Sequence, residues 1–263
     1  MKTILIKELK LNLKNFLIWS LVVGGMGFVC ILLYQSMETE MADMADAFSN
    51  MGAFSDAFGM STLSIASLKG FFATEVGTVH GLGSAMFASI LAIGILSKEE
   101  EMHSAEFLLS LPVSRKKVVT AKGLCVLIML VAFTAICTLL YCLAFVILGE
   151  GIETSIFITY MLRVLLMNIE IAGICFSVSA FSGKNRMGAG IGIALMFYVF
   201  DLMGRVVPDL KDYLFIGPFS FANASEIMSE IEPKASSFIV GIILTVLGVA
   251  TAYWIYDKRD ISS

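Results

Sequence analysis

The sequence predicts an all-α polytopic membrane protein with six transmembrane helices. Of its 263 residues, 58% are hydrophobic and only 15% are charged, whereas a soluble domain carries about 25% charged residues. Six apolar runs are long enough to cross a hydrocarbon core about 30 Å thick, which takes about 20 helical residues. They cover residues 16–34, 77–97, 123–148, 156–181, 187–207 and 238–256. We therefore expect residues 1–263 to form a single transmembrane domain.

A lysine-rich segment precedes the first apolar run. Over residues 3–15 the apolar positions share one helical side and the basic positions share another, namely Ile6, Leu9 and Leu13 against Lys7, Lys10 and Lys14. This pattern predicts an N-terminal amphipathic helix that lies in the membrane interface. The alternative is a charged flank that only orients the first span.

Basic residues set the expected orientation. An even number of spans places both termini on one side of the membrane. Most of the 18 Lys and Arg residues lie in the termini or in the loops on that side. Because cytoplasmic loops carry an excess of Lys and Arg, we expect both termini and the loop over residues 97–122 in the cytoplasm, with the chain in the cell membrane.

The first external loop, residues 35–75, is acidic and rich in Met and Phe. Its MADMADAF segment, residues 41–48, is predicted to be helical and to lie against the outer interface. Met37, Met41 and Met44 have helical spacing, and thioethers can bind Cu(I). Without nearby His or Cys, an apolar interfacial stripe is favoured over a copper site.

Two spans contain pairs of small residues four positions apart. The second span has Gly77 and Gly81, and the fifth has Gly188 and Gly192. Such pairs let helix backbones approach closely. These two spans are therefore predicted to make the tightest helix packing.

The longest strongly charged passage, residues 97–122, lies between the second and third spans. Acidic residues come first and basic residues follow: Glu99, Glu100, Glu101 and Glu106, then Arg115, Lys116, Lys117 and Lys122. An apolar stripe with helical spacing lies between them, at Met102, Ala105, Leu108 and Leu109. Pro112 should end this helix near Leu111, because proline lacks an amide hydrogen, and Ser114 can cap the next helix. We expect an elbow whose glutamates face an aqueous partner while the stripe packs on apolar surface.

Ionisable residues also occur inside the apolar runs. Arg163 and Glu170 share one face of the fourth span but lie about 10 Å apart along its axis, so Asn168 or another helix is expected to mediate between them. Asp201 and Arg205 are four residues apart and can pair. Charged groups within spans mark either a polar substrate path or proton relay, or structural pairs that fix helix register.

An irregular segment, residues 208–235, precedes the last span. Its apolar piece, YLFIGPFSF, is too short to cross the membrane. A short external helix over residues 223–232 is predicted. The whole segment should be re-entrant or lie on the outer surface.

Motifs for catalysis and cofactor binding are missing from the sequence. A P-loop needs GxxxxGK followed by Ser or Thr, and Val178 stands where its first glycine should precede Gly183-Lys184. No zinc motif or nucleophile elbow occurs. His80 lies one helical turn from Ser84, and a catalytic dyad there is disfavoured because such pairs arise readily by chance. We expect no catalytic, cofactor-binding or metal site, and no enzyme activity.

The elbow resembles the signature E…GT-x-E-x-LLS-x-PVSR…K between the second and third spans of type-2 ABC exporter permeases. The matching residues are Glu100, Glu106, Leu108, Leu109, Ser110, Pro112, Val113, Ser114, Arg115 and Lys122. Two weaker similarities follow, at Pro218-Phe219 before the last span and at 257–261 (DKRDI) after it. The chain departs from the signature at His103-Ser104, where the family usually has Gly-Thr.

The resemblance implies a permease that works with other proteins. The partners would be a separate ABC ATPase, a second permease chain as a homodimer or related heterodimer, and the lipid bilayer, but not nucleic acid. ATP and Mg would bind to the ATPase, and alternating access would reorient the second and fifth spans. The elbow would be the coupling helix that docks on the ATPase, through Glu99, Glu100, Glu101, Met102, Glu106, Leu108, Leu109, Pro112 and Arg115.

The large apolar fraction favours export of an amphipathic or lipophilic cargo, such as a membrane-active peptide, an antibiotic or a lipid. The acidic outer loop favours a cationic peptide. The alternative function is a self-sufficient secondary transporter or channel that uses Arg163, Glu170 and Asp201, although no clear internal repeat supports it. Arg163, Asn168, Glu170 and Asp201 are the candidate residues of a translocation path.

Overall fold

The computed structural model describes residues 1–101, 103, 113–184 and 186–259. Every regular element in these ranges is a helix. Six helices of the described chain are long and apolar enough to cross a membrane, which confirms the predicted all-α fold with six spans. They are Lys2–Ser49, Leu68–Ile93, Arg115–Leu148, Thr154–Phe181, Met187–Val206 and Ala235–Lys258.

The first span is built from α1 (Lys2–Trp19), the π-helical turn η1 (Ser20–Gly24) and α2 (Gly25–Ser49). The second joins α4 (Leu68–Phe71), the π-helical turn η2 (Phe72–Val76) and α5 (Gly77–Ile93). The other four are α8 (Arg115–Leu148), α9 (Thr154–Phe181), α10 (Met187–Val206) and α13 (Ala235–Lys258). The shorter helices are α3 (Ala53–Phe58), α6 (Lys98–Glu101), α11 (Pro208–Lys211), η3 (Leu214–Ile216), η4 (Pro218–Phe221) and α12 (Ala224–Met228).

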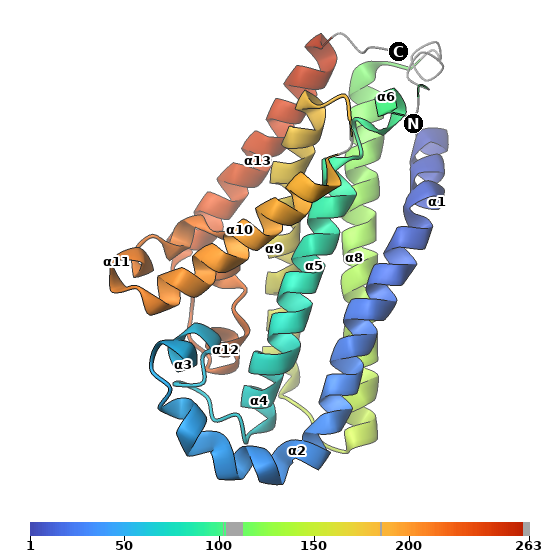
Figure 1. Ribbon diagram of the computed structural model, residues 1–263. Helices are drawn as coiled ribbons and strands as arrows, with labels where there is room; N and C mark the ends of the chain where they lie inside the picture. Colours follow the sequence, from blue (N-terminus) through green and yellow to red (C-terminus); the bar gives the residue numbers. More distant parts are fainter. Residues whose placement is uncertain (102, 104–112, 185, 260–263) are drawn as a thin grey trace.

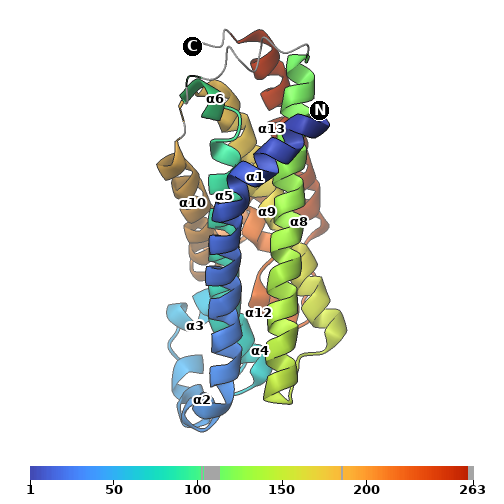
Figure 2. The same ribbon diagram turned by 90° about the vertical axis from the view of Figure 1, so that its right-hand side faces the viewer.

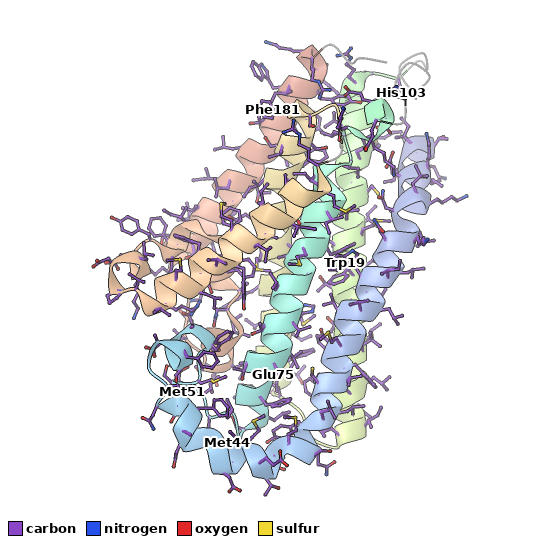
Figure 3. The ribbon with its side chains drawn as sticks, in the orientation of Figure 1. Trp19, Met44, Met51, Glu75, His103 and Phe181 are labelled. Carbon is purple, nitrogen blue, oxygen red and sulfur yellow. The ribbon has the colours of Figure 1, made fainter. Side chains whose placement is uncertain are left out.

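The start of α1, the end of α13 and α6 lie at one end of the helical bundle, which we call the terminal end, whereas α2 and α4 reach the opposite end (Figures 1 and 2). The spans α5 and α9 are the most buried. The helix α9 packs against α5 and α13, α10 packs against α5, and α8 packs against α1 and α2. The labelled side chains show the same two ends of the bundle, with His103 near the terminal end and Met44 and Met51 near the opposite end (Figure 3).

The predicted interfacial helix is continuous with the first span. Residues 3–15 are helical, but the helix runs unbroken from Lys2 to Ser49. The backbone stays helical through the π-helical turn, with φ −63° at Ser20 and −66° at Gly25. The predicted MADMADAF helix is its far end. Met37 and Met41 pack against the core while Met44 is exposed, so the three methionines do not share one environment.

The closest approach of two spans joins α9 to α13. A Cβ atom on Gly248 would lie 2.4 Å from the carbonyl oxygen of Gly173, and one on Gly173 would lie 3.2 Å from Thr245 Cα. Gly248 has no room for a side chain, and one at Gly173 would require α13 to move by a few tenths of an ångström. The two glycines therefore let these backbones touch, which is the usual role of small residues between membrane helices.

The predicted glycine pairs behave differently. A Cβ on Gly77 would lie 2.4 Å from Ala224 Cβ of α12, but neither Gly188 nor Gly192 has a neighbour within 4 Å of its Cβ position. The expected tight contact at Gly188 and Gly192 is therefore wrong within this chain. Gly190 makes the tight contact instead, since a Cβ atom there would lie 3.0 Å from Ile93 Cγ2 of α5. This residue lies on the opposite helical face from Gly188 and Gly192.

The segment before the last span folds back into the bundle. The predicted helix over 223–232 is shortened to α12, capped by Asn223, whose side chain accepts a hydrogen bond from Glu226 N at 3.1 Å. Phe219 and Phe221 are buried, and η4 contacts α9, α10 and α13. The second half of the apolar piece is thus covered by protein, as irregular backbone at membrane depth requires, whereas Tyr213 and Ile216 in its first half are exposed.

Replacing Gly248 with Ala should separate α9 from α13. The added methyl group meets a backbone atom that cannot rotate away, so we expect a loss of about 1–3 kcal/mol, the range for overpacked cores. Thermal unfolding in detergent should show a Tm lowered by roughly 2–4 °C per kcal/mol. Gly192→Ala, whose methyl group meets nothing within 4 Å, is the matched control. Equal Tm values for both variants would contradict the close approach.

Candidate functional site: an ion cluster at the terminal end

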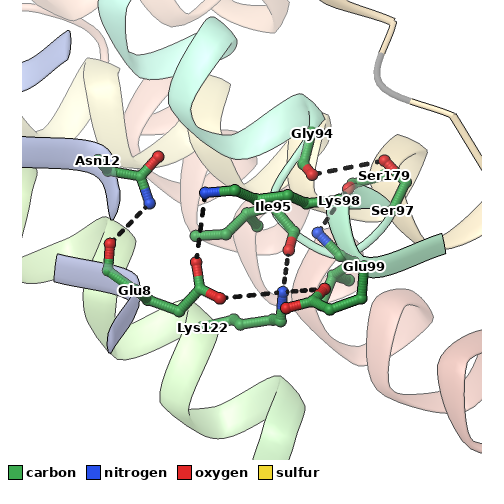
Figure 4. Close-up of polar contacts among 10 residues, drawn as sticks. Glu8, Asn12, Gly94, Ile95, Ser97, Lys98, Glu99, Lys122 and Ser179 are labelled. Atoms are coloured by element: carbon green, nitrogen blue, oxygen red, sulfur yellow. Dashed lines mark hydrogen bonds and ion pairs between the residues drawn. The ribbon is translucent and has the colours of Figure 1, made fainter. Parts of the chain in front are cut away.

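A fully buried lysine lies where α6 meets the spans. Lys122 of α8 has 0% exposure. Its Nζ atom is 2.5 Å from Glu99 Oε2 of α6 and 3.5 Å from Glu8 Oε1 of α1 (Figure 4). It also donates a hydrogen bond to the carbonyl oxygen of Ile95, which follows α5. One ammonium group therefore joins four segments of the chain.

Lys98 completes the cluster, with its Nζ atom 4.0 Å from Glu8 Oε2. We call Glu8, Lys98, Glu99 and Lys122 the ion cluster. It contains two carboxylates and two ammonium groups, so its formal charges balance. Balance matters here because removing one partner of a buried ion pair leaves an uncompensated charge, which costs about 3–5 kcal/mol.

A second set of contacts ties the same short helix to the other side of the bundle. Arg259, which follows α13, pairs with Glu100 and donates a hydrogen bond to Ala180 O of α9 at 2.8 Å. Arg115 at the start of α8 donates to the backbone carbonyls of Tyr256, Asp257 and Arg259, the last at 2.6 Å. Side chains of α6 are therefore linked directly or through one residue to α1, α8, α9 and α13.

The predicted coupling residues fall into three groups. Glu99 and Glu100 are each 6% exposed, so the expectation that they face an aqueous partner is wrong in the single chain: basic side chains of neighbouring helices draw them inward. Glu101 is exposed and Arg115 is half-buried. Met102, Glu106, Leu108, Leu109 and Pro112, with the rest of the predicted stripe, lie outside the described residues.

The sequence reasoning assigned no role to Lys122 or Glu8. The sequence places Lys122 in the charged passage and the elbow signature without a partner, and Glu8 lies in the lysine-rich segment, where no pattern singles it out. A signal was present, because Lys122 stands at the edge of an apolar run, where an unpaired charge would be unfavourable. Its partner could not be chosen among the acidic residues nearby, since Glu8 is far away in sequence.

His103 has a left-handed backbone, with φ +50°. The elbow signature has glycine at this position, and glycine adopts positive φ without steric cost. His103 therefore adopts a backbone conformation that the glycine of the signature could adopt without steric cost.

The intramembrane charges of α10 form a closed network. Asp201 accepts two hydrogen bonds from Arg205, at 2.8 and 3.1 Å, which confirms the predicted pair. Arg205 also donates to Glu226 of α12 at 2.8 Å. This third partner was not predicted, and it fixes the short helix before the last span against α10.

Arg163, Asn168 and Glu170 do not form such a network. Arg163 is half-buried. The amide atoms of Asn168 and both carboxylate oxygens of Glu170 are buried and have no hydrogen-bond partner in the described part of the chain. The predicted mediation by Asn168 between Arg163 and Glu170 is therefore absent from the described contacts.

His80 is part of an aromatic core. Its Nδ1 atom lies 3.0 Å from the hydroxyl of Tyr141, and its ring stacks on Phe133 at 6.2 Å. Ser84 donates its hydrogen bond to Gly81 O of its own helix. Among the described contacts, His80 and Ser84 therefore bond to different partners and not to each other.

The family model for ABC-2 family transporter proteins matches residues 2–261, so the chain belongs to this family. It is the membrane-spanning permease subunit of an ABC transporter, a multi-pass protein that partners with an ABC ATPase. No curated protein matches the sequence.

Replacing Lys122 with Met should destabilise the protein strongly. The substitution leaves the carboxylates of Glu8 and Glu99 buried without their shared cation, at a cost of about 3–5 kcal/mol. Thermal unfolding should show a large fall in Tm, and the double variant Lys122→Met, Glu99→Gln should recover part of it. Lys116→Met on the same helix is the control, since its pair with Asp257 is largely exposed and contributes about 0–1 kcal/mol. Equal Tm values for the single variants would refute the role of the cluster.

Replacing His103 with Val should destabilise the elbow, whereas His103→Gly should not. A β-branched residue at φ +50° clashes with its own backbone, and the left-handed conformation costs non-glycine residues about 1–2 kcal/mol. Thermal unfolding of the two variants beside the unchanged protein measures the difference. A Val variant as stable as the Gly variant would show that this backbone conformation is wrong.

Proposed function

We propose that this permease is the membrane half of an ATP-driven exporter in the cell membrane, with its terminal end in the cytoplasm. Two permease chains would assemble with two ATPase subunits, and ATP and Mg would bind to the ATPase. The observation that carries this proposal is the buried position of Lys122 between α1, α6 and α8. The excess of basic residues at the terminal end supports the orientation.

In this proposal the elbow, residues 97–122, is the element on which the ATPase acts. Its first turn, α6, is tied through Glu99 to Lys122 and through Glu100 to Arg259. A displacement of α6 must therefore move the ends of α1, α8 and α13 or break buried ion pairs, which is unfavourable. Movement imposed at the elbow would thus reach several spans together, as a rigid-body change does.

The spans α5 and α10 are the ones we propose to reorient between inward-open and outward-open states. They touch at Gly190, where Ile93 and the carbonyl oxygen of Ser89 lie within 3.2 Å of a built Cβ. The chain enters the elbow directly after α5, so that span receives the displacement first. The closed Asp201–Arg205–Glu226 network would keep α10 and α12 together during the change.

The cargo we propose is amphipathic or lipophilic. Three exposed carboxylates, Asp43, Asp46 and Asp56, lie on α2 and α3 at the end of the bundle opposite the termini. They give the outer end a negative potential, which attracts cations. This charge favours a cationic cargo, such as a membrane-active peptide.

Replacing Glu106 and Leu109 together by Gln should uncouple the ATPase from the permease. Both side chains belong to the predicted docking helix, so we expect substrate-stimulated ATP hydrolysis to fall severalfold while membrane insertion and Tm stay unchanged. The measurement uses the permease co-purified with an ATPase encoded beside it and reconstituted into vesicles. Export is checked there by ATP-driven accumulation of a fluorescent cationic peptide in inside-out vesicles.

Lys117→Gln, an exposed change beyond the elbow's predicted helix, is the control and should keep full coupling. Unchanged stimulation in the Glu106 and Leu109 variant would rule out the elbow as the docking element. Accumulation only in right-side-out vesicles would show that the transporter is an importer.

A further inference from the structure

One carboxyl group without a partner lies deep in the bundle. Glu170 is 2% exposed, and neither of its oxygens has a hydrogen-bond partner in the described residues. None of the ion pairs found in the described ranges includes it. It lies near the middle of α9, about 17 Å along the axis from Phe181. An intramembrane carboxylate in this situation requires a counter-group.

Glu170 points into a hollow between α9 and α13. The hollow has a volume of about 200 Å³, and its other lining residues are almost all apolar. Leu166, Ile242 and Val246 form part of its wall and are 48%, 65% and 60% exposed. The hollow therefore opens on the outer surface of the bundle, where lipid chains surround a membrane protein.

A second apolar hollow adjoins the first. It has a volume of about 280 Å³, lies between α8, α9 and α13, and shares Ile169 and Thr245 with the first. We call these two adjoining hollows the groove; its one acidic lining residue, Glu170, belongs to the first hollow. This is the shape of a site for a molecule with one polar head and an apolar body.

The acidic end of the groove also carries aromatic rings. A Cβ atom on Gly241 would lie 2.6 Å from Glu170 Oε2 and 3.4 Å from Phe221 Cε1. The carboxyl group and the ring thus converge on a position that only glycine leaves open. The rings of Phe221 and Phe238 stack at 5.0 Å. A carboxylate beside aromatic rings is a favourable setting for an ammonium group, which gains both a charge-assisted hydrogen bond and a cation–π contact.

We propose that this groove is a binding site, reached from the bilayer, for an amphiphile that carries a primary or secondary ammonium group on an apolar body. Glu170 accepts hydrogen bonds from the ammonium group, the rings of Phe221 and Phe238 flank it, and the apolar body lies along α9. The site deepens the proposed function by giving the cargo a chemical class. The claim that this amphiphile is transported rests on the proposed function. The claim that it binds does not, since binding needs no ATPase.

Equilibrium binding of radiolabelled dodecylammonium to the purified chain in maltoside detergent tests the site. We expect saturable binding at one site per chain. Glu170→Gln should weaken it about tenfold or more, because a hydrogen bond to a charged group is lost. Gly241→Ala should also weaken binding, since its methyl group displaces the carboxylate. Dodecanol, which has the same chain and no charge, should not compete.

Glu150→Gln removes an exposed carboxylate, Gly192→Ala adds a methyl group in open space, and both should bind like the unchanged protein. Full binding by Glu170→Gln, or equal competition by dodecanol, would overturn the proposal. If Glu170→Gln does not fold, the Gly241→Ala and dodecanol measurements decide. Binding that depends on Glu170 without ATP-driven transport of dodecylammonium would count against the proposed export of such cargo and leave the site standing. Transport of a cationic peptide without dodecylammonium binding would count against the site and leave the proposed export standing.

Discussion

The described structure depends on one buried cation. Lys122 has no exposed surface and is balanced by carboxylates from α1 and α6. An ion pair in this setting contributes less to net stability than to geometry, because any rearrangement that separates the charges is penalised by desolvation. The terminal end of the bundle therefore has few alternative arrangements. The helix that receives force in our proposal is also the helix whose position is most constrained by charge.

Charged residues elsewhere in the bundle differ in whether the described chain supplies them with a partner. Arg205 donates hydrogen bonds to both Asp201 and Glu226, so its charge is compensated by side chains of the described chain. Glu170 is the opposite case, a buried carboxyl group whose surroundings are apolar. A permease needs both kinds. Complete networks hold helices together while the protein changes state, and an incomplete one can be completed by something that binds.

Much of the fold was predictable from sequence because its causes are local. Apolar run length sets the spans, and the four-residue separation of Asp201 and Arg205 sets their pairing. The ion cluster was not predictable in this way. Glu8 and Lys122 meet only after the bundle has formed, and the burial of Glu99 and Glu100 depends on Lys122 and Arg259 arriving from other helices.

Glycine spacing predicted the close helix contacts only in part, because contacts between helices also depend on the assembled bundle. The pattern at Gly188 and Gly192 identifies a helix face without bulk, but it does not say whether another helix of the chain covers that face. The structure places Gly190 against α5 instead. Similarly, the alternation of Lys and apolar residues over residues 3–15 describes the side chains around a helix. It contains no proline or other stop signal, so nothing ends the helix before the first span.

The unbroken helix from Lys2 to Ser49 has a mechanical consequence. At a rise of about 1.5 Å per residue, 48 residues follow a path of about 70 Å, more than twice the thickness of a hydrocarbon core. Glu8 near one end belongs to the ion cluster, while Asp43 and Asp46 near the other lie on the opposite surface. A tilt about the π-helical turn η1 would move these two ends in opposite directions. Such a tilt would couple the two membrane surfaces through one continuous helix, without passing through a loop.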